Sequence, residues 1–195
     1  MNSAYIASVI NSTLRSTTPI LLAALGCAMC SQVGVFNVAL EAQMLIACFT
    51  SIAVDYYTSS VLLSVLAGVL SGAVVGAVVA VLQVKYKAAD MVVGTALNLL
   101  ATAIAVVISK YFSESGSAKL NYSNKPFLFS IGGLELSVFV PLGLILLVVS
   151  YIVLYKTRFG LRLRACGEHP QAADSVGINV YKMRYAGVIL SGALG

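Results

Sequence analysis

Long apolar runs constrain the fold of this chain more than any other feature. A helix needs about 20 apolar residues to cross the hydrocarbon core of a bilayer. Five apolar runs of this chain are candidate spans, and a sixth run opens at Ala186 and reaches Gly195 after ten residues. We therefore expect an all-α, polytopic transmembrane helix bundle of about five spans plus a truncated sixth, within a longer protein of which this chain is a fragment. The five complete candidates are 18–33, 35–54, 61–82, 90–110 and 137–155.

Composition supports this class of protein. The chain is 59% hydrophobic and 10% charged, and its mean hydropathy is +0.96, whereas soluble domains average about 45–50% apolar and about 25% charged residues. A 195-residue globule cannot bury so much apolar surface, so the excess must face lipid. A cleaved signal is not indicated, because residues 1–18 hold only Arg15 as a cation.

The distribution of basic residues predicts the orientation. The net charge of +5 does not point to nucleic acid, because most cations lie in short loops between apolar runs, as the positive-inside rule describes. We expect loops 83–90 and 156–185 to be cytoplasmic in the cell membrane of a prokaryote. The N-terminus and segment 111–136 then lie outside. Residues 1–16 have apolar side chains at helical spacing, which suits a segment that lies along the outer interface.

Two groups of small residues indicate packing. Gly68, Gly72 and Gly76 recur every four residues, so they share one helix face that another helix can approach closely. Cys27 and Cys30 have CxxC spacing inside an apolar run, without a second pair or a nearby histidine, which favours packing over a zinc site. We expect no metal, no cofactor and no disulfide framework.

Polar residues interrupt two of the apolar runs. In GVFNVALEAQ (34–43), Asn37 and Glu41 are four residues apart, which would place them on one face of a helix. They are candidates for a substrate pathway, together with Gln43 and Asn98, because charged or amide groups in a span usually face the bundle interior or a polar path. The alternative is a structural clamp near the Gly34 turn, with Asn98 in an interhelical hydrogen bond.

The basic loop 156–185 contains a short helix. Pro170 suits a first helical turn and Gly177 suits the position just past a helix end, so we expect a helix at about 171–176. Ala172, Ala173 and Val176 would share one face. A helix this short needs a docking surface, which is either the bundle itself or another protein. The single histidine, His169, is interpreted as a residue at the start of this helix.

These motifs together resemble a known family. Glu168, Pro170, Ala172-Ala173 and Gly177, framed by RFGLRLRACGEHP and SVGINVYK, resemble the cytoplasmic coupling loop of ABC importer permeases. GVFNVALEAQMLIA and VVGTALNLLAT are similar to two further stretches of the branch that imports simple sugars, nucleosides and branched-chain amino acids. The resemblance runs from about residue 19 to 195 and mildly favours nucleosides over simple sugars, through TLRSTTPILLAALG ahead of residue 34.

The resemblance implies a machine of several chains. The sequence has no GxxxxGKS or GxxxxGKT phosphate loop, so ATP hydrolysis falls to a partner. The family implies cytosolic ABC ATPase subunits that receive the coupling helix, a second permease subunit (identical or related), and an extracytoplasmic solute-binding protein. The chain is then one transmembrane permease domain, 1–195, which is not an enzyme and which works by alternating access.

Other classes of function remain open at this point. The main alternative is a secondary transporter or channel that uses Glu41 as a proton or ion site. A membrane enzyme is poorly supported, because the spans hold no histidine pair, Ser-His set or acid cluster. A structural or assembly subunit is the third alternative.

Overall fold

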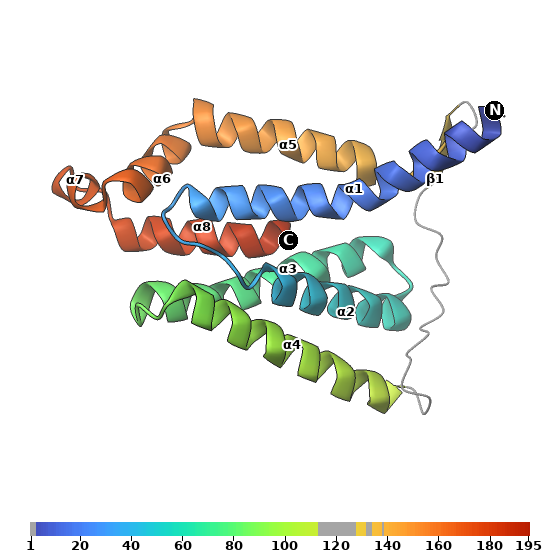
Figure 1. Ribbon diagram of the computed structural model, residues 1–195, viewed down its shortest axis with the longest axis horizontal. Coiled ribbons are helices and arrows are strands. Elements are labelled where there is room, and N and C mark those ends of the chain that lie inside the picture. Colours follow the sequence, from blue (N-terminus) through green and yellow to red (C-terminus); the bar gives the residue numbers. More distant parts are fainter. Residues whose placement is uncertain (1–2, 113–127, 132–133, 138) are drawn as a thin grey trace.

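The computed structural model describes residues 3–112, 128–131, 134–137 and 139–195 as an elongated bundle of helices (Figure 1). The all-α transmembrane bundle expected from the apolar runs is confirmed. The described elements, in chain order, are α1 (Ser3–Ser31), α2 (Leu40–Thr58), α3 (Val61–Ala80), the π-helix η1 (Val81–Lys85), α4 (Asp90–Phe112), β1 (Leu128–Ile131), β2 (Leu134–Ser137), α5 (Phe139–Lys156), α6 (Arg158–Glu168), α7 (Pro170–Ser175) and α8 (Val180–Leu194).

In the described part of the chain, four stretches are long and apolar enough to cross a membrane: Ser8–Ser31, Val61–Lys85, Asp90–Lys110 and Phe139–Lys156. They correspond to four of the five expected spans. The fifth, 35–54, corresponds to α2, which begins only at Leu40 and is not among the four. One addition was not expected: β1 and β2 pair antiparallel, with Leu128 opposite Ser137, inside the predicted outer connection 111–136. Residues 113–127 of that connection lie outside the described part of the chain.

The segment with helical spacing near the N-terminus is continuous with the first span: from Ser3, α1 runs unbroken through Pro19 to Ser31. Its position along the outer interface stays a prediction. Proline removes one backbone donor from a helix, and the helix continues without it. Three threonine hydroxyls in the adjacent turns each donate to the carbonyl four residues earlier. The bonds measure 2.8–2.9 Å and join Thr13 to Val9, Thr17 to Thr13 and Thr18 to Leu14. The apolar spacing and the span therefore belong to one long helix.

The connections divide between the two ends of the bundle. Figure 1 shows α6, α7 and the turn between α3 and α4 at one end, and the start of α1, the strands, the end of α4 and the start of α5 at the other. Loops 83–90 and 156–185 therefore share an end, as the charge pattern requires. They hold eight of the twelve basic residues: Lys85, Lys87, Lys156, Arg158, Arg162, Arg164, Lys182 and Arg184.

The glycine face of α3 lies against two other helices. A Cβ atom at Gly68 would collide with the Ser51 hydroxyl of α2, and one at Gly72 would collide with the Gly192 carbonyl of α8. At Gly76 a Cβ atom would lie 3.1 Å from the Val188 carbonyl oxygen. Contact this close is possible only without side chains, so the face positions α8 at the centre of the bundle. There Val188 packs with Cys30, Val79 and Ala80 in a buried cluster.

Candidate functional site

The chain between α1 and α2 folds back into the bundle. After Ser31, residues 32–39 (the 32–39 loop) run from the end that carries α6 toward the middle, where α2 begins (Figure 1). Gly34 makes the turn with φ +73°, a conformation that glycine adopts readily. A Cβ atom there would lie 3.2 Å from the Gly167 backbone of α6, so the turn packs directly on that helix.

Non-helical backbone inside a membrane bundle needs partners for its polar groups, because lipid offers none. Polar side chains from distant elements supply them. The Phe36 N–H donates to Asp90 Oδ2 of α4 at 3.0 Å, and Gln83 Nε2 of η1 donates to the Phe36 carbonyl at 3.3 Å. Asn98 Nδ2 donates to the Val38 carbonyl at 3.2 Å, and its Oδ1 accepts from the Ala42 N–H at 3.0 Å.

Asn37 occupies the centre of this arrangement and is 3% exposed. Its Nδ2 donates to Gln43 Oε1 and to Ser191 Oγ of α8, each at 3.0 Å, and its Oδ1 accepts from the Ala39 N–H at 3.1 Å. Gln43 is fully buried, and its Nε2 has no partner. The side chain of Asn37 therefore ties the 32–39 loop to α2 and α8.

The predicted shared helix face of Asn37 and Glu41 is wrong. Asn37 lies before the first turn of α2, and its hydrogen bonds go to Gln43 and Ser191. Glu41 is exposed in the first turn of α2. The apolar residues on either side gave the pattern of a continuous helix, but the turn at Gly34 and the long-range hydrogen bonds of the loop keep residues 35–37 out of a helix. Substrate contact by Asn37, Glu41, Gln43 or Asn98 stays a prediction.

The second candidate site lies at the end of the bundle. Thr157 Oγ1 caps α6 by accepting from the Gly160 N–H at 3.2 Å, and the Arg164 guanidinium lies 4.8 Å from the centre of the Tyr155 ring. These contacts hold α6 against the end of α5. Leu163 and Cys166 face inward and are fully buried. Burial raises the pKa of the Cys166 thiol, although nearby Arg184 acts in the opposite direction.

α7 stands beyond α6 (Figure 1) and begins at Pro170, with His169 between the two helices. It ends at Ser175, and Gly177 follows with a φ of +85° and an N–H that donates to the Asp174 carbonyl at 2.9 Å. The expected helix is therefore present, shifted by one residue to 170–175. The three residues predicted to share one face differ in exposure: Ala173 is 4% exposed, whereas Ala172 is exposed and Val176 is 79% exposed.

The exposed side of α7 borders a groove of about 480 Å³. Its walls are mainly apolar, and the charged residues Arg162 and Glu168 from α6 also line it. Such a groove can receive a complementary surface of another protein. The groove is lined by Leu161, Arg162, Ala165, Glu168, His169, Ala172, Ala173, Val176 and Ile178.

Several residues of these sites had no signal in the sequence analysis. Gln83 stands at the end of one apolar run and Asp90 at the start of the next, where polar residues at the membrane interface are ordinary. Ser191 is one small polar residue in an apolar run, and Gly167 stands next to the predicted short helix. Only their contacts with the 32–39 loop mark them. A search for polar residues near the ends of spans could have selected Asp90 and Gln83 as candidates.

Comparison with known proteins agrees with this architecture. Residues 9–195 match the family described as "Branched-chain amino acid transport system / permease component". The chain belongs to this permease family. No solved structure gave a significant match.

The permease is similar to several curated family members. It is 37% identical over 203 residues to the nucleoside ABC transporter permease protein NupC of Lactococcus lactis subsp. cremoris (strain MG1363), with 96% of this chain and 64% of the relative covered. It is 34% identical over 206 residues to the guanosine ABC transporter permease protein NupQ of Bacillus subtilis (strain 168), with the same coverage. A putative glucose ABC transporter permease protein of Haloferax volcanii, TsgC13, is 30% identical over 203 residues, with 96% of this chain and 60% of the relative covered. The permease thus spans less than two thirds of these relatives' length.

Proposed function

We propose that this permease is the membrane-spanning part of an importer driven by a separate ATPase, with a nucleoside as its solute. The observation that carries the proposal is α7, a six-residue helix held beyond the bundle with Ala172 and Val176 exposed. Its end of the bundle also holds most of the basic residues, which supports a cytoplasmic position. The family match and the nucleoside permeases among the relatives support the solute.

The contacts around α7 suggest how force would pass into the bundle. A partner that pulls on α7 acts on α6 through His169, where the two helices meet. α6 in turn contacts the 32–39 loop, where Gly34 meets Gly167. That loop is bonded to η1, α4 and α8 through Gln83, Asp90, Asn98 and Ser191. Closure of two ATPase subunits would therefore rearrange the bundle about its centre, as alternating access requires.

The remaining partners complete the proposed machine. A second permease subunit, identical or related, would form the other half of the translocation path, and an extracytoplasmic binding protein would deliver the solute. The ATPase subunits would hydrolyse ATP, so this chain would be a transport subunit and not an enzyme. Loops 83–90 and 156–185 would lie in the cytoplasm, and the N-terminus and 111–136 outside.

The docking of α7 can be tested with the full-length chain. Val176→Arg places a charge on the exposed side of α7, and Met91→Arg places the same charge on α4 at the same end, where Met91 is 66% exposed. We expect Val176→Arg to reduce copurification with the ATPase subunits at least tenfold and Met91→Arg to leave it unchanged. Equal recovery of the ATPase with both variants would contradict the docking role.

Transport provides the second test. Proteoliposomes that contain the full-length permease, its ATPase subunits and the binding protein should accumulate guanosine only with ATP. Uptake that follows a proton gradient without ATP, and that Glu41→Gln abolishes, would instead support a secondary transporter.

A further inference from the structure

The corner between α5 and α6 carries the densest run of positive charge in the sequence. Residues 156–164 hold four basic residues and no acidic one: Lys156, Arg158, Arg162 and Arg164. The side chains of Lys156, Arg158 and Arg162 are exposed, and we call these three residues the basic corner. Arg158 and Arg162 stand four residues apart in α6, so they lie on one face of that helix.

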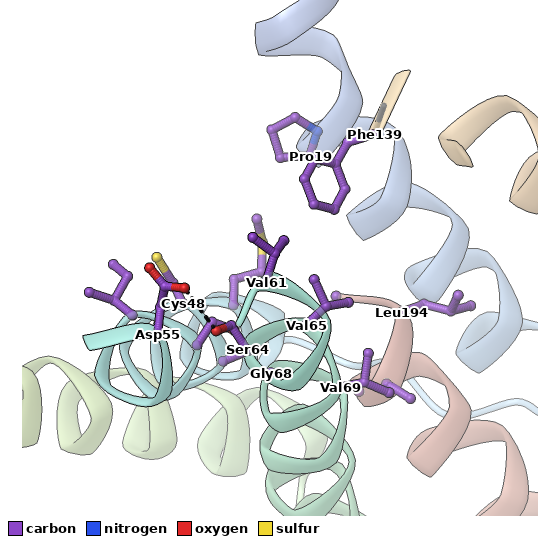
Figure 2. Close-up of a pocket in the computed structure, with 17 residues that line it drawn as sticks. Pro19, Cys48, Asp55, Val61, Ser64, Val65, Gly68, Val69, Phe139 and Leu194 are labelled. Atoms are coloured by element: carbon purple, nitrogen blue, oxygen red, sulfur yellow. Dashed lines mark hydrogen bonds between the residues drawn. The ribbon is translucent and has the colours of Figure 1, made fainter. Parts of the chain in front are cut away.

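The basic corner lies where a membrane span ends. α5 is long and apolar enough to cross a bilayer and has Lys156 as its last residue. It starts in the other half of the bundle at Phe139, which lines a pocket together with Pro19 of α1 (Figure 2), and it reaches α6 at the opposite end (Figure 1). The three cations therefore stand at the level where hydrocarbon gives way to lipid headgroups.

Two tyrosines mark the same level of α5. Tyr151 and Tyr155 are exposed and one turn apart, and their rings stack with centroids 5.1 Å apart. Tyrosine is enriched at membrane interfaces because its ring is apolar and its hydroxyl bonds to water. The Arg164 guanidinium lies 4.8 Å from the centre of the Tyr155 ring, so α6 is attached to the end of α5 at this point. The basic corner is thus held in place by contacts within the chain.

We propose that the basic corner binds the phosphate-bearing headgroup of an anionic phospholipid. Phosphate oxygens accept strong hydrogen bonds from lysine and arginine, and cations next to a span attract anionic lipids. The acyl chains have a surface to follow: Leu144, Val148 and Ile152 are exposed and, with Lys156, recur every four residues along α5. The inference requires α5 to span a membrane and does not depend on the solute or on the ATPase.

The main alternative is a general attraction of this positively charged end to any anionic surface, and a matched pair of variants separates the two. The full-length permease in detergent is titrated with phosphatidylglycerol, or with phosphatidylcholine of the same acyl chains. Bound lipid is counted by native mass spectrometry. Lys156→Gln with Arg158→Gln removes two cations of the basic corner. Lys85→Gln with Lys87→Gln removes two exposed cations elsewhere at the same end.

We expect wild type to bind phosphatidylglycerol at least about tenfold more tightly than phosphatidylcholine, because each cation near the membrane contributes about fivefold. The preference should fall below about threefold when the two cations of the corner are removed. It should persist in Lys85→Gln with Lys87→Gln. It should also persist in Lys156→Arg with Arg158→Lys, which keeps both charges at the corner.

A preference that survives Lys156→Gln with Arg158→Gln would overturn the inference, and loss of ATPase copurification in that variant would then assign the corner to the partner protein. An equal loss in both glutamine pairs would also overturn it, because that result indicates general attraction. Displacement of phosphatidylglycerol by millimolar glycerol 3-phosphate would assign the corner to a soluble phosphate instead of a lipid. None of these outcomes bears on the proposed function, which ATP-driven guanosine uptake decides.

Discussion

Replacement of Asn37 by leucine tests the role of the 32–39 loop most directly. The two side chains have similar size, so Asn37→Leu removes the hydrogen bonds and leaves little cavity. Two buried groups then lose the partner that the structure gives them: Gln43 Oε1 and the Ala39 N–H. Ser191 Oγ also loses the bond that it accepts from Asn37, but its own O–H can still donate to an acceptor.

The expected loss of stability follows from these two groups. A buried polar group left unpaired costs about 1–3 kcal/mol, so the variant should lose about 2–4 kcal/mol of unfolding free energy if the loop relaxes partly. For a domain of this size, about 2–4 °C of melting temperature corresponds to each kcal/mol. We therefore expect the midpoint of thermal unfolding to fall by about 5–10 °C.

The assay is thermal unfolding of the full-length permease in detergent, followed by size-exclusion chromatography with fluorescence detection. Ser191→Ala removes one of the three bonds and should produce a smaller decrease than Asn37→Leu. Glu41→Gln changes an exposed side chain and should leave the midpoint within about 2 °C, as surface substitutions usually do. A decrease below about 2 °C in Asn37→Leu would refute the view that these hydrogen bonds hold the loop.

Three further predictions concern other parts of the bundle. Gly72→Ala should cost about 1–3 kcal/mol, because its Cβ collides with the Gly192 carbonyl; a thermal midpoint equal to that of wild type would contradict this packing. Asn98→Leu should cost about 1–3 kcal/mol in the same assay, because the Ala42 N–H loses its acceptor, and retention of full stability would show that the loop finds another partner. Cys166 should resist N-ethylmaleimide at pH 7.5 and react in SDS, because burial raises its thiol pKa and the thiolate is the reactive form. In the native protein its reactivity should rise only at pH above the ordinary thiol pKa. Rapid modification of the native protein at pH 7.5, measured by peptide mass spectrometry, would contradict its burial.

Much of the architecture follows from short-range patterns in the sequence. Apolar length located α3, α4 and α5, because a span must be long and apolar whatever surrounds it. Pro170 and Gly177 located α7, because the ring of proline and the positive φ of glycine are local properties of the backbone. The charge of the two basic loops correctly placed them at one end of the bundle. These features depend on residues that are neighbours in the chain.

The contacts of the polar groups were decided only by the tertiary structure. Asn37 bonds to Ser191, 154 residues away, and Asn98 bonds to Val38, 60 residues away; no local pattern encodes such pairs. The helix expected across residues 35–37 gives way to the 32–39 loop because distant side chains satisfy its backbone. Likewise, Ala172 and Ala173 are neighbouring residues of the same type, yet Ala172 is exposed and Ala173 is buried. The difference arises because α6 and the connection after α7 cover a single side of that helix. The sequence alone thus located the long apolar helices and the short helix α7, and indicated that the two basic loops share one end of the bundle. Which polar residues meet inside the bundle required the fold itself, since it depends on packing between helices.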